Sequence, residues 1–142
     1  MTKQSLAFLE SYINNPSPTS FEAGGQKIWL KYLEPYIDEW FLDDYGTAVG
    51  VIKPGKDYKV VIEAHADEIS WYVNYITNDG LIYVIRNGGS DHQIAPSKKV
   101  LIHGAKGVVK GVFGWPAIHT RSGEKEEAPT LKNIFIDCGC TS

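Results

Sequence analysis

The sequence predicts the opening of an α/β domain over residues 1–69, followed by a small all-β domain, a barrel or a sandwich, over residues 70–142. Two segments with apolar residues at helical spacing begin the chain, and alternating segments follow them. A short β-branched run then ends at a histidine and two carboxylates. Beyond it, closely spaced strand patterns with glycine-rich turns and no helical period are typical of small barrels and sandwiches.

The composition is that of a globular protein. Of 142 residues, 43% are hydrophobic and 22% are charged, far from the disordered class. The formal net charge is −3 and the basic residues are scattered, so we expect neither a nucleic acid nor an anionic membrane as a partner. The sequence shows no signal-peptide pattern and no apolar run of membrane length, which predicts a cytoplasmic protein.

Two helices are predicted at the start of the chain. Apolar residues recur at helical spacing over residues 6–13, and the pattern stops at a loop rich in asparagine and proline. Thr19, with Glu22 three residues later, predicts a capping box for a second helix. Its apolar face continues over residues 21–33 until Pro35 ends it.

Three strands should follow the helices. Residues 40–42 and 48–52 alternate around a turn at residues 43–46. Residues 60–64 begin with Val-Val-Ile, a run typical of a strand buried on both faces. The order of these elements indicates an α/β sheet of which only the first strands are present.

His65 and Asp67 stand at the carboxyl end of the predicted buried strand, where α/β proteins place catalytic side chains. Residues two apart on a strand point to the same side, so the imidazole and the carboxylate can converge on one metal ion or one substrate. From these residues alone, a structural histidine paired with a carboxylate is the other interpretation.

The second half reads as a series of strands. They are predicted over residues 70–77, 81–86, 99–103, 106–113 and 133–137, and Asn78-Asp79-Gly80 is a strong hairpin signal between the first two. The charge-rich residues 122–130 predict a mobile, solvated loop.

The remaining candidate ligands do not form a metal-binding pattern. Cys138 and Cys140 lack further ligands at suitable spacing, which favours ordinary reduced thiols over a soft-metal site or a redox pair. The histidines are too widely spaced for sequence to support their convergence, and Asp91-His92 is interpreted as a structural pair in a loop. The four histidines are His65, His92, His103 and His119.

Several segments in order resemble one enzyme family, the dinuclear metallo-aminopeptidases that include glutamyl, deblocking and tetrahedral aminopeptidases, some of which carry an endoglucanase label. The segments are residues 17–22 (Ser-Pro-Thr-Ser-Phe-Glu), 44–47 (Asp-Tyr-Gly-Thr), 65–69 (His-Ala-Asp-Glu-Ile), 88–89 (Gly-Gly), 100–104 (Val-Leu-Ile-His-Gly), 107–109 (Gly-Val-Val) and 136–139 (Ile-Asp-Cys-Gly). The resemblance covers nearly the whole chain, and the histidine element is its most diagnostic part.

The resemblance implies roles for two residues. His65 would ligate one of two divalent ions, zinc or cobalt, and Asp67 would be the catalytic-site carboxylate that orients it. Glu68 continues the motif without an assigned role. Two ions bridged by a carboxylate and a water would activate that water, and family members remove N-terminal residues from peptides.

The resemblance also implies that much of the enzyme lies outside this chain. The other metal ligands and the glutamate general base belong to a C-terminal catalytic half that would follow Ser142. Residues 1–69 would then be the first part of the catalytic domain, with the first strands of a phosphorylase/hydrolase-like sheet, and residues 70–142 an inserted barrel-like dimerisation domain. We therefore expect a homo-oligomer that lacks aminopeptidase activity as an isolated chain. The alternative function is a β-rich self-association module without catalysis.

Overall fold

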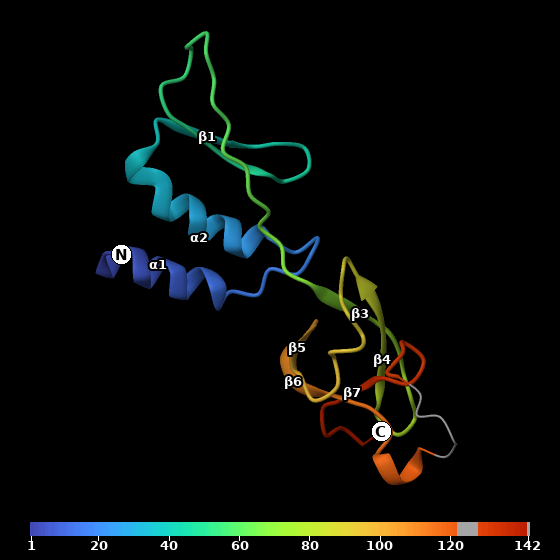
Figure 1. The fold of residues 1–142 in the computed structure, drawn as a ribbon. Helices are drawn as coiled ribbons and strands as arrows, with labels where there is room; N and C mark the ends of the chain where they lie inside the picture. Colours follow the sequence, from blue (N-terminus) through green and yellow to red (C-terminus); the bar gives the residue numbers. More distant parts are fainter. Residues whose placement is uncertain (122–127, 142) are drawn as a thin grey trace. The chain divides into compact units, whose positions relative to one another are not determined.

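The computed structural model describes residues 1–121 and 128–141, so most of the loop predicted over residues 122–130 lies outside the described residues. The chain forms two compact units, Met1–Glu68 and Ile69–Ser142 (Figure 1). No helix in the described part of the chain is long and apolar enough to cross a membrane.

The first unit begins with the two predicted helices, which the structure confirms. They are α1 (Lys3–Ile13) and α2 (Ala23–Leu33), and the short 3₁₀ helix η1 (Glu34–Tyr36) carries Pro35 where α2 ends. Thr2 caps α1 because its hydroxyl accepts the Ser5 N–H at 3.1 Å. Phe8 of α1 stacks on Tyr32 of α2 with ring centroids 4.1 Å apart, so aromatic packing joins the two helices.

The predicted capping box of the second helix is wrong. Glu22 occupies the N-cap position of α2 and makes no side-chain capping bond there. Its carboxylate instead accepts the Ser20 N–H at 2.6 Å. The Thr19 hydroxyl donates to Asp67, 48 residues away. Helix α2 begins at Ala23, so Thr19 lies three residues before the N-cap position and Glu22 is not in the first turn, where a capping box needs it.

An antiparallel pair of strands follows the helices, as the alternating pattern predicted. Strands β1 (Glu39–Leu42) and β2 (Ala48–Val51) pair antiparallel, with Glu39 opposite Val51 and Leu42 opposite Ala48. Asp43 closes the connecting turn, and Gly46 takes φ of 81°, a backbone conformation that favours glycine.

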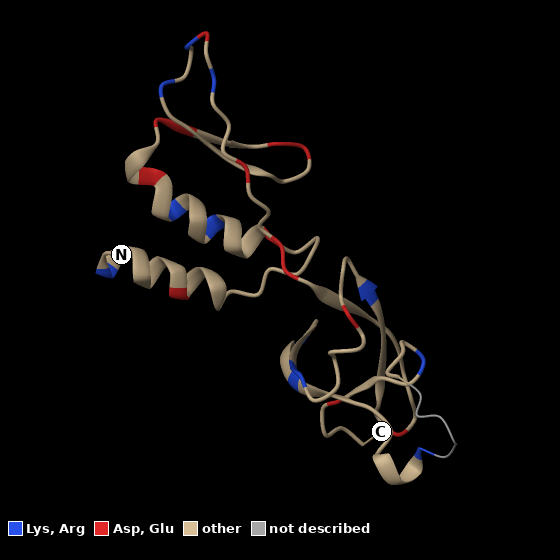
Figure 2. Ribbon diagram, in the orientation of Figure 1, with Lys and Arg blue, Asp and Glu red and all other residues tan. Residues whose placement is uncertain are grey.

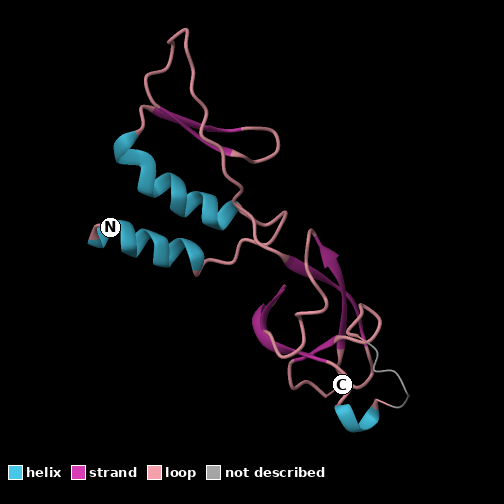
Figure 3. Cartoon of the chain, in the orientation of Figure 1, coloured by secondary structure: helices cyan, strands magenta, loops and turns pink. Residues whose placement is uncertain are grey.

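The prediction of a buried strand over residues 60–64 is wrong, because this segment is a loop in the structure (Figure 3). Val60, Val61 and Ile62 are 74%, 82% and 95% exposed. A strand exists only where a neighbour completes its hydrogen-bond ladder, and no strand pairs with this segment among the described residues. The described part of the first unit therefore holds only the β1–β2 pair, and the larger α/β sheet is not confirmed.

The second unit is a curled antiparallel sheet (Figure 1). Its strands are β3 (Ser70–Ile76), β4 (Ile82–Asn87), β5 (Lys99–Gly104), β6 (Gly107–Gly114) and β7 (Phe135–Asp137), and the 3₁₀ helix η2 (Ile118–Thr120) follows β6. Each of these strands matches a predicted strand. The predicted hairpin is also confirmed, since Gly80 takes φ of 84° between β3 and β4. The described strands run in the order β3-β4-β7-β6-β5, so the sheet curls but does not close as a barrel.

One face of this sheet carries the core. Alternate residues of β4 and β7 point into it, and Trp71 packs edge-on against Phe113 with ring centroids 5.3 Å apart. The buried apolar residues are Ile82, Val84, Ala95, Phe113, Ile134 and Ile136. On the other face Tyr75 stacks on Tyr83 at 4.8 Å, close to Phe135. The second unit therefore has a core of its own, whereas the first unit leaves an apolar segment in solvent.

Replacing Ile134 by alanine should lower the free energy of unfolding by about 2–5 kcal/mol, because the side chain is 0% exposed and its removal leaves a cavity. Chemical denaturation followed by tryptophan fluorescence measures this loss. Ile85→Ala is the control: Ile85 is 46% exposed on β4 of the same unit, so its loss should stay below about 1 kcal/mol. Equal losses for the two variants would contradict the assigned core.

Candidate functional site

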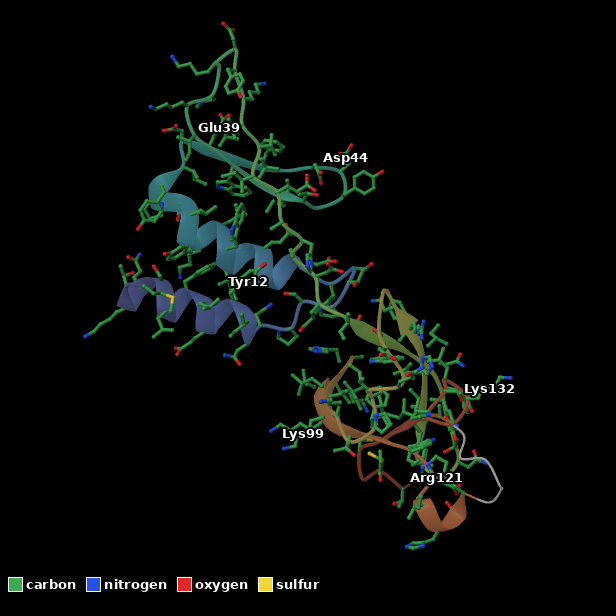
Figure 4. All side chains as sticks on the ribbon, viewed as in Figure 1. Tyr12, Glu39, Asp44, Lys99, Arg121 and Lys132 are labelled. Carbon is green, nitrogen blue, oxygen red and sulfur yellow. The ribbon has the colours of Figure 1, made fainter. Side chains whose placement is uncertain are left out.

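The first unit contains a cavity of about 310 Å³ beside the predicted site residues. Four segments line it: the end of α1, the first turns of α2, the β1–β2 turn and the segment before β3. Tyr12 of α1 and the turn residue Asp44 are labelled in Figure 4. The lining residues are Tyr12, Glu22, Gln26, Trp29, Tyr45, Gly46, Thr47, Ala48, Ala64, His65, Ala66 and Asp67.

The charge around this cavity is acidic. Figure 2 shows Asp and Glu in the β1–β2 turn and in the segment leading into β3. Glu22 and Asp67 are the carboxylates in its lining, which contains no lysine or arginine among the described residues. Such a surface attracts cations, whether a metal ion or a protonated amine.

His65 and Asp67 contact each other directly. His65 Nδ1 lies 3.0 Å from Asp67 Oδ1 and 3.0 Å from the Asp67 carbonyl oxygen. Both neighbours are acceptors, so Nδ1 carries the proton in the neutral ring and Nε2 keeps its lone pair. The imidazole is 85% exposed. A histidine held through Nδ1 by a carboxylate, with an accessible Nε2, has the arrangement of a metal-ligating histidine and its supporting residue.

The second oxygen of Asp67 is also engaged. Thr19 Oγ1 donates to Asp67 Oδ2 at 2.6 Å. This bond and the bond from His65 hold the pKa of Asp67 below its ordinary value of 3.8, because both stabilise the ionised carboxylate. Asp67 is therefore an anion at neutral pH.

Glu68, to which the sequence assigns no role, fastens two distant segments. Its Oε1 accepts the Ser17 N–H at 2.9 Å, and its own N–H donates to the Ser17 carbonyl at 2.9 Å. Pro18 and Glu68 form a parallel β-bridge. The loop between α1 and α2 is thereby tied to the chain directly after Asp67. Sequence reasoning missed this role because the partners lie 51 residues apart.

Gln26 is a second residue that sequence reasoning missed. Its Nε2 donates to the Gly46 carbonyl at 2.8 Å, and its Oε1 accepts the Ala48 N–H at 2.6 Å. One amide thus fixes both sides of the β1–β2 turn against α2. The available signal was a polar residue three positions before Trp29, on the stripe of α2 that packs.

The described residues do not by themselves fit a complete metal centre. Among them, no group of three or more His, Cys, Asp or Glu side chains could hold an ion. His92 contacts Arg86 of β4, and Asp91 accepts the Gln93 N–H, so both contacts lie within the second unit. One imidazole is fewer protein ligands than a zinc-type site uses.

The two cysteines are free thiols. A hydrogen bond with Cys138 raises the pKa of Cys140 above its ordinary value of 9.0. A raised pKa lowers the thiolate fraction at neutral pH, so this exposed thiol is a poor nucleophile. The geometry agrees with the interpretation of both as ordinary reduced thiols.

The fold of the chain is that of aminopeptidases. It superposes with a TM-score of 0.91 on the crystal structure of a TET aminopeptidase from a marine sediment Thaumarchaeota archaeon, at 26% identity, over 98% of this chain and 39% of that one. Residues 46–142 match the family model described as M42 glutamyl aminopeptidase. The chain belongs to this family, as the resemblance predicted.

Named relatives agree with this assignment. The chain is 28% identical over 137 residues to a lysyl aminopeptidase of Pyrococcus furiosus, covering 94% of this chain and 39% of the relative. It is 32% identical over 117 residues to the putative aminopeptidase FrvX of Escherichia coli, covering 81% and 33%. A Thermotoga maritima structure named as an endoglucanase matches with a TM-score of 0.70 at 25% identity, covering 93% and 37%.

The chain thus spans between about a third and two fifths of the length of these proteins. The relatives that carry these names are more than twice as long as the segment that this chain matches. The match therefore assigns the family to this chain, and the activity of the whole protein needs its own argument.

The turn that lines the cavity should respond to acid through Asp43. Its Oδ1 accepts the N–H groups of Tyr45 and Thr47, and the Thr47 bond is the main cause of its lowered pKa. A lowered pKa means that the turn is fully stabilised above the unfolded value near 3.8 and loses this stabilisation as pH falls through the folded value.

An NMR titration of the Asp43 side-chain carbon should therefore give a midpoint below 3.8, and the amide shifts of Tyr45 and Thr47 should report the same midpoint. Thr47→Ala removes the hydroxyl bond and keeps the amide bond, so it should raise the midpoint only part of the way. A wild-type midpoint at or above 3.8 would contradict the described turn.

Proposed function

We propose that this chain supplies the first part of a metal-dependent aminopeptidase of the M42 type, which removes N-terminal residues from peptides. His65 would be one ligand of a divalent zinc or cobalt centre, with two ions as the family resemblance implies, and Asp67 the carboxylate that orients it. The main support for this proposal is the family match over residues 46–142, which includes the His65–Asp67 pair in ligand-like geometry.

The chain's own residues prepare a ligand rather than a complete site. Asp67 keeps the Nδ1 proton of His65 in place and leaves Nε2 as a lone-pair donor. A bound divalent ion would supply Lewis acidity and an activated water. The remaining ligands and the general base would come from residues other than those described, so we expect the 142-residue chain alone to be inactive.

The exposed apolar run at Val60–Ile62 supports this view, because an exposed β-branched run of this kind is typical of a strand that lacks its neighbours. In the whole protein, further strands of the same domain would cover it.

Self-association is the second part of the proposal. The face of the second unit opposite its core exposes apolar side chains, and the outer edges of the edge strands β3 and β5 have no partner among the described strands. The exposed residues on that face are Tyr72, Tyr75, Ile85, Leu101, Val108 and Val112. We expect a homo-oligomer formed through this unit. A cytoplasmic location is supported by two free thiols, which suit a reducing compartment.

A self-association module without catalysis would need only the second unit. The family match extends into the first unit and includes the His65–Asp67 pair, which such a module would not require. Family membership therefore favours the aminopeptidase.

The test measures zinc and cobalt bound after anaerobic purification, for the chain alone and for the chain mixed with the complementary part of an M42 relative. Alone, the chain should hold far less than one ion; the mixture should bind metal and cleave an aminoacyl-anilide. In the mixture, Asp67→Asn should lower metal affinity about 10- to 100-fold.

His65→Ala should abolish metal-dependent activity of the mixture, and His92→Ala, a histidine of the second unit, is the matched control that should retain it. Tight stoichiometric metal binding by the chain alone would contradict the proposal. So would an active mixture that tolerates the loss of His65.

A further inference from the structure

Asp67 uses its two carboxylate oxygens for two different partners. Oδ1 receives the His65 Nδ1–H at 3.0 Å, and Oδ2 receives the Thr19 hydroxyl at 2.6 Å. The Thr19 contact is the shorter of the two. Two contacts from opposite oxygens fix the plane of the carboxylate, which one contact alone would leave free to rotate.

Thr19 is itself held in place. Its N–H donates to the Glu68 carbonyl at 3.3 Å, beside the paired bonds between Ser17 and Glu68. As a β-branched residue it has few side-chain rotamers. On the other side of the loop, Gly25 leaves room for Ser17, since a Cβ there would come within 2.5 Å of the Ser17 hydroxyl. The loop is therefore fixed close to both α2 and the segment that carries Asp67.

The geometry points to Thr19 as a positioning residue, whose hydroxyl sets the orientation of Asp67 and through it the tautomer and orientation of His65. The importance of this for catalysis rests on the proposed function, but the positioning itself does not. Thr19 stands before the N-cap residue Glu22 of α2, and its hydroxyl donates to the site.

The consequence of losing the hydroxyl follows from the contacts. Without Thr19 Oγ1, the Asp67 carboxylate can turn about its terminal torsion and leave Nδ1 with only the backbone carbonyl as an acceptor. The imidazole then gains access to the tautomer protonated on Nε2. In that tautomer, the nitrogen that faces solvent no longer offers a lone pair.

The test compares Thr19→Val with Thr19→Ser in the full chain by long-range ¹H–¹⁵N NMR, which distinguishes the two tautomers of neutral histidine. Thr19→Val keeps the shape and removes the hydroxyl; it should lower the ratio of Nδ1–H to Nε2–H in His65 at least threefold. Thr19→Ser keeps the hydroxyl and should stay within the wild-type ratio. His92, His103 and His119 serve as internal controls that should not change.

An unchanged His65 ratio in Thr19→Val would overturn the inference, and so would an equal shift in both variants, which would assign the effect to packing. If Thr19→Val perturbs the amide spectrum of α1 and α2, three-bond couplings of wild-type Thr19 decide instead. A single χ1 rotamer supports the inference, and rotamer averaging rejects it. No metal or activity is needed, so this outcome is separable from failure of the proposed aminopeptidase.

Discussion

The Asp67 carboxylate is the point on which the first unit depends. It is bonded to His65 on its own segment and to Thr19 on the α1–α2 loop, and Glu68 next to it binds the same loop through Ser17. The bonds to that loop join parts of the chain 48 and 51 residues apart. Asp67 therefore does two things: it ties the α1–α2 loop to the segment that carries His65, and it accepts the Nδ1–H of His65, which leaves Nε2 as the lone-pair nitrogen.

The two units differ in how much of their apolar surface they bury. The curled sheet buries its own core around Ile134 and is independent in this respect. The first unit has packed helices and a fixed turn, yet its most apolar segment, at Val60–Ile62, lies in solvent. This contrast agrees with the finding that the chain spans about two fifths of the length of these relatives. The hydrogen bonds among Thr19, His65 and Asp67 are formed, whereas the apolar side chains of Val60–Ile62 remain uncovered.

Local periodicity was enough to predict the helices and the strands of the second unit, because those elements bury a face that recurs every two or about 3.6 residues. It failed for residues 60–64, where β-branched composition predicts a strand but pairing depends on neighbours that no local pattern contains. It failed again at Thr19, whose partner Asp67 is remote in sequence. His65 and Asp67 were identifiable because their spacing and the surrounding motifs are local. The roles of Gln26 and Glu68 were not, since each binds backbone groups far along the chain.

The most direct measurement is a crystal structure of the metal-loaded complex that contains this chain and the part completing the site, with anomalous data at the metal edge. We predict that His65 Nε2 lies about 2.0–2.1 Å from a zinc ion, with Nδ1 still bonded to Asp67. Ligation through Nδ1, or a metal centre that does not include His65, would contradict the proposed site.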